Sequence, residues 1–425
     1  MKISIFWFRR DLRLEDNTAL YNAITENKNV LPIFIFDKSI LDELEHDDPR
    51  VNFIYNTLKK INQKLQKYNS SIKILKGETE EVWKLLIKSY NINSVYINKD
   101  YEPYAIKRDQ KIAELLTGNG INLFAFKDQV THEESEVVKA DGTPYTVFTP
   151  YKNKWLSLYT AKDVKPKITF QNFLKENNIF PSLESIGFKE SKIAVKAFDL
   201  NNLNNYGETR NFPALDSTSY LGPHLRFGTI SIRQIISQLE KPNDVFLSEL
   251  IWREFFMQIL FHFPKVVTNN FRSKYNGIKW RTSEEDFEKW CQGKTGYPLV
   301  DAGMRQLNET GYMHNRVRMV CASFLCKHLL IDWRIGEAYF AKKLLDFDLS
   351  SNNGNWQWVA GTGCDAAPYF RIFNPSEQLK KFDASGTYIK SWLPEINSGK
   401  YTLPIVDHKL ARARALEAYK DGILN

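Results

Sequence analysis

Short hydrophobic runs alternate with amphipathic stretches along the first 130 residues. Five runs rich in β-branched and aromatic residues stand out: KISIFWF, VLPIFIFD, SIKILKG, SVYIN and INLFAF. Over residues 49–68, apolar positions recur every three or four residues, which is the spacing of one buried helix face. Alternating strands and helices are typical of a parallel sheet with right-handed crossovers. The pattern predicts an α/β domain over residues 1–130, a doubly wound, Rossmann-like sheet of five parallel strands.

The periodicity changes twice in the remainder of the chain. Residues 131–205 are rich in lysine and proline and keep no sustained period, so we interpret them as an interdomain connector. From residue 206 onward, long segments repeat their apolar residues at helical spacing, among them residues 315–330 and 335–348. Most of the tryptophans lie beyond residue 250. We therefore expect an all-α domain over residues 206–425, with large rings in or near its core.

Several functional classes are excluded by what the chain lacks. FRRDLRLEDN follows the first strand in place of G-x-G-x-x-G, so any ligand of the α/β domain binds in another way. No apolar run approaches the length of a membrane span, and the start of the chain is typical of a first strand, not of a signal peptide. The four cysteines have no zinc-type spacing. We expect reduced thiols, no metal and a cytoplasmic location.

The net charge of +8, with a pI near 9.0, has two interpretations. A basic protein favours polyanionic partners, and nucleic acid is the first candidate. The alternative is a solvated surface that happens to be rich in lysine. Charge alone favours neither.

Candidate chemistry concentrates in residues 350–375, SSNNGNWQWVAGTGCDAAPYFRIFNP. On a helix, Trp356 and Trp358 would point about 200° apart, so they cannot serve the same surface. Core packing explains most such pairs. Here the neighbouring asparagines and glycines favour a ligand site, because backbone without side chains allows a planar group to approach closely.

Five segments together resemble the photolyase/cryptochrome family: WFRRDLRLEDN, TSYLGPHLRFG, ELIWREFF, GKTGYPLVDAGMRQLNETGYMHNRVRM and NNGNWQWVAGTGCDAAPYFRIFNP. Within it they are similar to class I cyclobutane-pyrimidine-dimer (CPD) DNA photolyases, from Ile5 to about Glu395. The resemblance implies a carbon–carbon lyase that repairs UV-damaged DNA in light. In that reaction an electron passes from excited, reduced FAD to a flipped-out dimer.

The resemblance also implies an FAD site in the helical domain. Its contacts would be Tyr206, Thr218, Ser219, Tyr220, Leu221, Gly222, Arg253, Arg318, Asp346, Phe347, Asp348 and Asn352. Residues 218–222 would hold the phosphates, in agreement with hydroxyl and backbone N–H groups at a turn into a helix. Arg318 would pair with Asp346 beside the flavin, and Asn352 would face flavin N5.

Three tryptophans match the electron-transfer triad of the family: Trp280, Trp333 and Trp356. The resemblance places Trp356 nearest the flavin, Trp333 in the middle and Trp280 at the surface. Indole rings in such a series allow an electron to reach the flavin in short steps. For any one ring alone, core packing would be the ordinary explanation.

The residues expected to contact the lesion are Glu249, Trp252, Arg253, Asn315, Arg316, Met319, Trp358 and Gln378. Trp252 and Trp358 would hold the dimer, since aromatic stacking contributes roughly 1–3 kcal/mol per base. Glu249 would bond a pyrimidine. Weaker candidates for DNA phosphate contact are Lys152, Lys154, Arg226 and Arg371.

Two related functions stay open as alternatives. Enzymes that repair (6-4) photoproducts have a second histidine after the first, where this chain has Asn315 after His314. Plant cryptochromes, which sense blue light without repair, resemble this region with an aspartate in place of Asn352. Family members often add an antenna, methenyltetrahydrofolate or a deazaflavin. Glu102 falls where folate-binding members have a carboxylate, but a solvated surface role is as plausible, so the antenna is undetermined. We expect a monomer.

Overall fold

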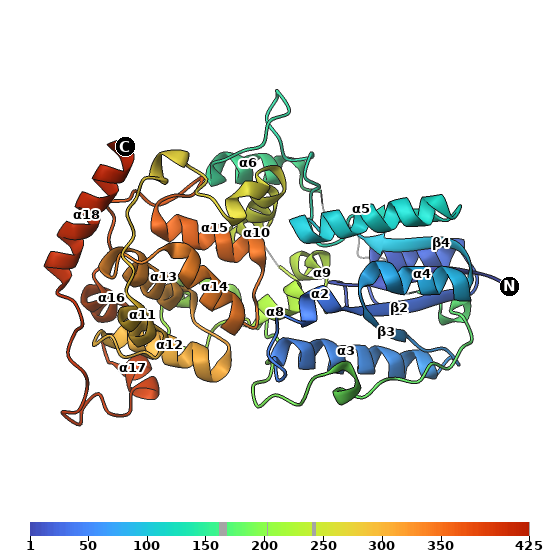
Figure 1. Cartoon of the computed structure of the whole chain (residues 1–425), viewed down its shortest axis with the longest axis horizontal. Helices are drawn as coiled ribbons and strands as arrows, with labels where there is room; N and C mark the ends of the chain where they lie inside the picture. Colours follow the sequence, from blue (N-terminus) through green and yellow to red (C-terminus); the bar gives the residue numbers. More distant parts are fainter. Residues whose placement is uncertain (161–167, 202, 240–243, 425) are drawn as a thin grey trace. The chain divides into compact units, whose positions relative to one another are not determined.

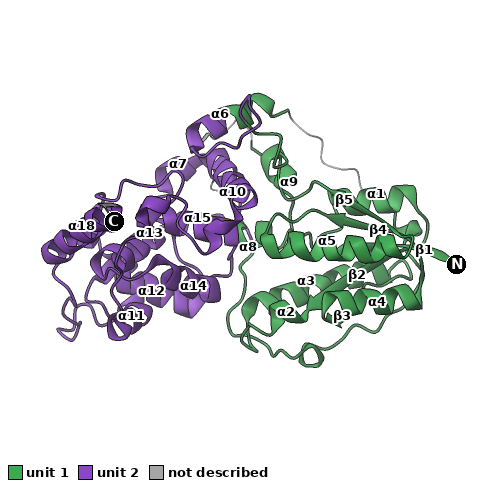
Figure 2. Cartoon of the chain, turned by 45° about the horizontal axis from the view of Figure 1, so that its top comes forward, with its two compact units in different colours: residues 1–138, 154–197, 221–242 green, residues 139–153, 198–220, 243–425 purple. Residues whose placement is uncertain are grey.

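The computed structural model describes residues 1–160, 168–201, 203–239 and 244–424. The chain forms two compact units, each assembled from segments distant in the sequence (Figure 2). Unit 1 contains residues 1–138, 154–197 and 221–242, and unit 2 contains residues 139–153, 198–220 and 243–425. The segment interpreted as a connector thus contributes residues to both units.

Unit 1 is built on a parallel sheet of five strands in the order β3-β2-β1-β4-β5 (Figure 1). The strands are β1 (Lys2–Phe8), β2 (Val30–Asp37), β3 (Lys73–Gly77), β4 (Asn91–Asn98) and β5 (Asn122–Phe126). Each coincides with one of the hydrophobic runs. The prediction of a doubly wound α/β fold is therefore confirmed.

The five helices that follow the first four strands cover both faces of this sheet. They are α1 (Thr18–Glu26), α2 (Lys38–Leu41), α3 (Pro49–Gln66), α4 (Thr79–Ser89) and α5 (Pro103–Gly118). Successive residues of a strand point to opposite faces. Phe6 of β1 accordingly packs in one core with Leu58 of α3, whereas Trp7 packs in a second core with Trp83 of α4.

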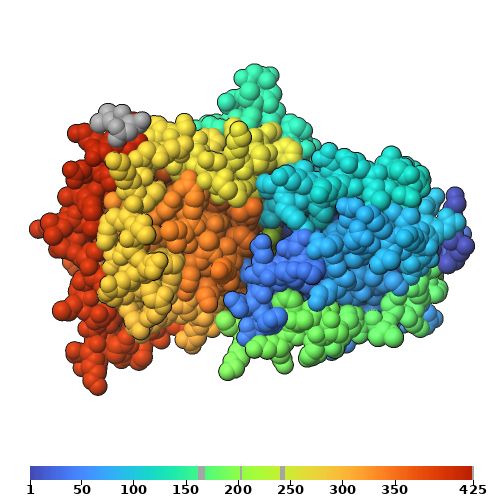
Figure 3. Space-filling model, in the orientation of Figure 1, coloured from blue at the N-terminus to red at the C-terminus, as the bar shows by residue number. Residues whose placement is uncertain are grey.

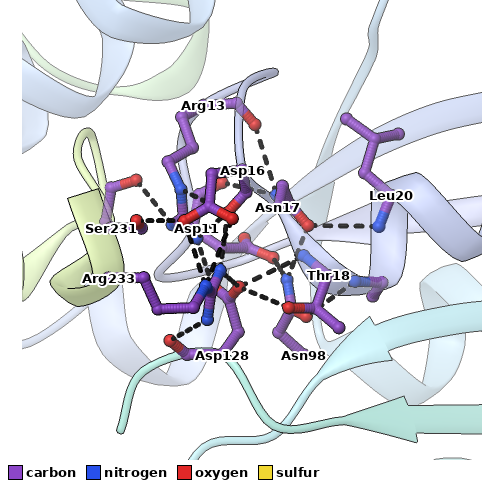
Figure 4. Close-up of polar contacts among 12 residues, drawn as sticks. Asp11, Arg13, Asp16, Asn17, Thr18, Leu20, Asn98, Asp128, Ser231 and Arg233 are labelled. Carbon is purple, nitrogen blue, oxygen red and sulfur yellow. Dashed lines mark hydrogen bonds and ion pairs between the residues drawn. The ribbon is translucent and has the colours of Figure 1, made fainter. Parts of the chain in front are cut away.

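A buried polar network lies beyond the carboxyl ends of β1 and β4, where the strand order reverses (Figure 4). It links eight residues: Asp11, Arg13, Asp16, Asn17, Asn98, Asp128, Ser231 and Arg233. Burial alone would raise the pKa of Asp128, but the charges of Arg13 and Arg233 outweigh it and lower that pKa. The network attaches α9 (Ile232–Ser237) to the loop after β1 within unit 1.

The remaining elements complete the two units. Unit 1 also holds α8 (Leu221–Arg226) and the short 3-10 turns η1 (Phe170–Asn172) and η2 (Glu184–Ile186), while α6 (Phe148–Leu158) begins in unit 2 and ends in unit 1. The other elements of unit 2 are η3 (Leu203–Asn205), α7 (Tyr206–Thr209), α10 (Asp244–His262), η4 (Pro264–Val267), η5 (Ser273–Tyr275), α11 (Glu284–Cys291), α12 (Pro298–Thr310), α13 (Asn315–Ser323), the π-helix η6 (Phe324–His328), α14 (Trp333–Lys343), α15 (Leu349–Ala360), α16 (Pro375–Phe382), α17 (Thr387–Trp392) and α18 (His408–Leu424). Among its described residues there is no strand, which confirms the all-α prediction.

Two helices differ from their sequence pattern. The apolar periodicity of residues 315–330 predicts one helix, but α13 gives way to a π turn in which Leu329 N–H donates to Phe324 O at 3.0 Å. The apolar pattern of residues 335–348 predicts a helix that extends to residue 348, whereas α14 ends at Lys343. Asp348 instead caps the next helix.

Unit 2 encloses a large hydrophobic core that includes Trp290, Trp333 and Trp356. A buried acid organises its edge: Asp301 of α12 accepts hydrogen bonds from Thr295, Gly296 and the hydroxyl of Tyr401. The C-terminal helix α18 lies on the surface of unit 2 (Figures 1 and 3). None of the helices described here is long and apolar enough to cross a membrane.

Candidate functional site

Helix α15 carries three of the expected site residues. Asp348 caps its start by accepting from the N–H of Ser351 at 3.1 Å. Asn352 and Trp356 are 9 % and 2 % exposed, whereas Trp358 is half-buried. A helix rises 1.5 Å per residue, so α15 holds Asn352 and Trp358 about 9 Å apart along its axis. One rigid element therefore positions a buried amide and an accessible indole.

The glycines of this region serve the protein's own packing. A Cβ atom at Gly354 would overlap the ring of Phe256 on α10. Gly361 ends α15 with a φ of 85°, a left-handed conformation that glycine adopts without strain. The expectation that these glycines admit a planar ligand is wrong for Gly354, because the planar group beside it is a phenylalanine side chain.

Asn352 is oriented by an acid that the sequence analysis missed. Its Nδ2 donates to Glu337 Oε1 at 2.7 Å and to the Glu337 backbone oxygen at 3.1 Å. Both amide N–H groups therefore point at α14, which leaves Oδ1 as the atom able to accept from a ligand. Burial raises the pKa of Glu337, and the bond from Asn352 opposes that rise. In the sequence, Glu337 looks like any acid on an amphipathic helix.

The predicted pair of Arg318 and Asp346 is confirmed, with the guanidinium 2.9 Å from Asp346 Oδ2. Asp346 Oδ1 is buried and has no hydrogen-bond partner within the described part of the chain. The same holds for Ser217 Oγ, Arg316 Nε and Gln378 Oε1. An unsatisfied buried polar atom costs about 1–3 kcal/mol. Unit 2 thus holds several polar atoms that a bound molecule would satisfy.

The expected phosphate loop adopts an unusual backbone. Tyr220 has a φ of 51°, in the left-handed region that non-glycine residues rarely occupy, and residues held in such conformations cluster at functional sites. Thr218 and Ser219 before it are half-buried, and Leu221 and Gly222 after it begin α8. Tyr206 starts α7, where burial, with a further contribution from the charge of Glu249, raises its pKa to about 12.

The three tryptophans of the expected triad differ in exposure. Trp333 is fully buried (0 % exposed), and its indole N–H donates to Asn270 Oδ1 at 2.9 Å. A Cβ atom at Gly336, one turn further along α14, would overlap Trp356. Trp280 is half-buried and meets Tyr419 edge-on, with ring centroids 5.9 Å apart. The structure therefore has two buried rings and one accessible ring.

The two tryptophans expected to hold the lesion are both half-buried and accessible. Trp252 lies on α10 and stacks on Phe148, with ring centroids 3.7 Å apart and an interplanar angle of 8°. Glu249, one turn earlier, accepts from Arg210 at 2.6 Å. Neither partner was predicted from the sequence. Arg210 could have been found from the sequence, since it follows Tyr206 at helical spacing. In the structure its guanidinium lies 5.3 Å from the Tyr206 ring.

Helix α13 supplies the next expected contacts. Asn315 is exposed, Arg316 donates to Asn211 Oδ1 at 2.7 Å, and Met319 is half-buried. His314 caps this helix through Nδ1. Burial, followed by the charges of Arg318, Arg316 and Arg210, lowers its pKa to about 4, so the imidazole is neutral at physiological pH. His314 therefore acts as a structural cap.

The other expected residues have mixed surroundings. Arg253 and Phe347 are half-buried in unit 2, and Phe347 packs against the large core. In unit 1, Glu102 accepts from Arg10 at 2.8 Å and from Arg226 at 2.7 Å. The weaker phosphate candidates also differ: Arg226 is engaged by this pair, Lys152 donates to Ser248 at 2.6 Å, Lys154 is half-buried and Arg371 is exposed.

Comparison with known proteins places this geometry in one class. Residues 246–400 match the family described as "FAD binding domain of DNA photolyase", and residues 4–169 match "DNA photolyase". The matched regions cover the sheet of unit 1 and the helices that carry most of the expected site. The unsatisfied Asp346 oxygen, the oriented Asn352 amide and the hydroxyl-bearing loop at residues 217–219 fit the polar groups of a flavin nucleotide. The class that the fold and the site define is therefore an FAD-binding one.

Full-length relatives narrow the class to a family. The deoxyribodipyrimidine photo-lyase of Synechococcus sp. is 36% identical over 98% of this chain and 96% of its own. A class III photolyase of Agrobacterium tumefaciens superposes with a TM-score of 0.88 at 35% identity, covering 100% of this chain and 98% of that one. A photolyase of Sulfolobus tokodaii, described with two FAD molecules, gives 0.86 at 35% identity, covering 99% and 100%. The chain belongs to the DNA photolyase family.

Proposed function

We propose that this protein repairs cyclobutane pyrimidine dimers in DNA in a light-dependent reaction. The observation that carries the proposal is the arrangement on α15, where one helix presents the Asn352 amide and, about 9 Å along, the accessible Trp358 ring. In this proposal Asn352 contacts the cofactor and Trp358 contacts the lesion. Because one rigid helix carries both residues, the distance for electron transfer between cofactor and lesion is short and fixed. The printed names of the relatives, deoxyribodipyrimidine photo-lyases, support the same activity.

Bound in its reduced form, FAD would supply the light-driven, one-electron chemistry by which the cyclobutane ring of the dimer is opened without net redox change. The protein supplies position and electrostatics. Asp346, Arg318 and Asn352 would hold the flavin, with Asn352 Oδ1 as an acceptor. The backbone and hydroxyls of residues 217–222, together with Tyr206, would bind the phosphate and sugar groups.

On the lesion side, Trp252 and Trp358 would stack on the extruded bases. A damaged pair costs less to extrude than an intact one, which contributes to selectivity. Glu249 would accept from a pyrimidine N–H, held for that role by Arg210. Arg253, Asn315, Arg316, Met319 and Gln378 would line the same cavity, and exposed cations such as Arg371 would contact DNA phosphates.

The tryptophans would return the cofactor to its reduced form. Trp356 and Trp333 are buried, and the Trp333 N–H faces an amide oxygen, which is no proton acceptor. An oxidised Trp333 would therefore keep its proton and pass the electron vacancy outward. Trp280 is accessible to water, so it would be the final donor of the series.

The test is direct. Chemically reduced protein is illuminated with an oligonucleotide carrying one thymine dimer, and the return of monomeric thymines is measured against a dark control. A parallel oligonucleotide carries a (6-4) photoproduct. Repair of the CPD alone is expected, because the neutral His314 and the neighbouring Asn315 offer no acid for (6-4) chemistry. A protein that bound FAD and absorbed light but repaired neither lesion would support a cryptochrome function and contradict the proposal.

Three further expectations complete the proposal. A monomer is expected, and sedimentation velocity tests it. A cytoplasmic location is expected, and fractionation of the host cell tests it. An antenna at Glu102 would have to compete with Arg10 and Arg226 for its carboxylate. Absorbance of the chromophores released on denaturation would show whether a folate or deazaflavin accompanies FAD.

A further inference from the structure

One face of the Trp252 indole is covered by the protein itself. The Phe148 ring lies parallel to it, with ring centroids 3.7 Å apart and an angle of 8° between planes. Phe255 meets both rings edge-on, at 5.5 Å from Trp252 and 5.9 Å from Phe148. Trp252 nevertheless stays half-exposed. A base that stacks on this indole while Phe148 is in place must use its other face.

Phe148 is held firmly in this position. The side chain is only 8 % exposed, and the residue is the first of α6. Its backbone N–H donates to Asp365 Oδ2 at 2.9 Å. One turn along, Lys152 donates to Ser248 of α10 at 2.6 Å, which attaches the same helix to the element that carries Trp252. These contacts are those of a fixed wall.

The anchor of Phe148 also leads to the second tryptophan. Asp365 lies in the loop that follows α15, seven residues after Trp358. In that loop, Ala367 N–H donates back to Trp358 O at 3.3 Å. Phe148 therefore contacts α10 through its ring and the loop after α15 through its backbone. It joins the two elements that carry Trp252 and Trp358.

We propose that Phe148 is a positioning residue for lesion recognition: it backs the Trp252 indole and fixes the spacing of the two tryptophans before DNA binds. The inference rests on the proposed function, in which these tryptophans hold the extruded dimer. Preorganised aromatic surfaces bind more tightly because fewer side chains have to be ordered when the ligand binds, which lowers the entropic cost. The Phe148 ring would thus raise affinity for the lesion without touching it.

The same stack has an opposite interpretation that experiment can separate. A phenyl ring 3.7 Å above an indole resembles a stacked base, and the competing hypothesis is that Phe148 is a placeholder that the lesion displaces. Removal of a placeholder would strengthen binding of the dimer, whereas removal of a wall would weaken it. The burial of Phe148 and its bond to Asp365 favour the wall.

The test compares Phe148→Leu, which removes the flat ring, with Phe148→Tyr, which keeps it. Phe263→Leu is the matched control, since it removes a ring from the Phe263–Phe271 pair of the same unit. Each FAD-loaded protein is titrated in the dark with fluorescent duplexes that carry one thymine dimer or none. An aromatic pair contributes enough for Phe148→Leu to reduce affinity for the dimer about three- to tenfold. Phe148→Tyr should restore it.

If the effect of Phe148→Leu is confined to lesion recognition, affinity for undamaged DNA, FAD content and the rate of photoreduction should stay unchanged in this variant. A purely structural defect would alter all three. Unchanged or tighter binding of the dimer by Phe148→Leu would overturn the proposal. If that variant does not fold, Asp365→Ala, which removes only the anchor of the Phe148 N–H, must show the same selective loss, and an unchanged affinity would again overturn it.

Trp252→Ala distinguishes a failure of the proposed function from a failure of the inference about Phe148. If Trp252→Ala leaves dimer affinity intact, the proposed function itself is wrong. If it weakens binding but Phe148→Leu does not, only the inference about Phe148 fails. In the Trp252→Ala background, Phe148→Leu should have no further effect, because the ring it backs is gone. Additive losses in the double variant would contradict the positioning role.

Discussion

The orientation of Asn352 offers the sharpest test of the cofactor site. Its amide hydrogens are directed at Glu337 by bonds of 2.7 and 3.1 Å, which leaves Oδ1 as the amide atom able to accept from the proposed flavin. If Oδ1 accepts from flavin N5–H, the contact exists only in the reduced cofactor. Anchoring of the amide should therefore raise the midpoint potential of bound FAD, and release of the anchor should lower it.

Two variants isolate the hydrogen bond from the charge. Glu337→Gln and Glu337→Leu both remove the acid, but only glutamine keeps an oxygen that can accept from Asn352. A neutral hydrogen bond contributes about 1 kcal/mol. For a two-electron couple this corresponds to about 20 mV. The midpoint potential should be about 20 mV lower in Glu337→Leu than in Glu337→Gln.

The assay is a redox titration of the bound flavin, followed by its absorbance against a dye of known potential. Asn352→Ala serves as the control, since without the amide the two Glu337 variants should give equal potentials. Identical potentials for the Leu and Gln variants in the presence of Asn352 would refute this account of the amide. A higher potential in the Leu variant would do the same.

Three further predictions concern the tryptophans and the buried polar groups of unit 2. Trp333→Phe should slow photoreduction severalfold but leave repair by chemically pre-reduced protein intact. A loss of both activities would argue against the proposed electron-transfer triad. Asp301→Ala should destabilise the protein by about 3 kcal/mol or more, because the buried carboxylate accepts four hydrogen bonds, and a shift below 1 kcal/mol in urea unfolding would contradict this. Burial lowers the pKa of Lys327 to about 7. Between pH 7 and the ordinary lysine pKa of 10.5, the Lys327 amine is protonated in the unfolded chain but not in the folded chain. The free energy of unfolding should therefore rise with pH in that window. Lys327→Met should flatten this rise, and equal slopes in urea titrations at several pH values would exclude the effect.

Hydrophobic periodicity was sufficient to predict both folds. β-Branched runs such as those of β1 and β2 are buried on both faces and have few alternatives to a parallel sheet. The π turn at residues 324–328 was not predictable, because its cause is local hydrogen bonding that leaves the apolar pattern unchanged. The early end of α14 was not predictable either, because Leu344 leaves the helix in an extended conformation and Asp348 caps the next helix while the apolar spacing continues unchanged.

The candidate site was only partly readable from the sequence. The Arg318–Asp346 pair was expected and is present. Glu337 and Phe148 were missed for a common reason: each acts through a contact with a distant segment, which no local spacing reveals. Gly354 illustrates the converse error, since a glycine beside polar residues suggested a ligand where the structure has the Phe256 ring.

The most direct test of the central claim is a count of turnovers. Pre-reduced protein is illuminated without further reductant in the presence of excess thymine-dimer DNA, and the dimers repaired are compared with the FAD present. Because the electron returns after each ring opening, many dimers should be repaired per cofactor. Repair that fails to occur, or that stops at one dimer per cofactor, would contradict the account.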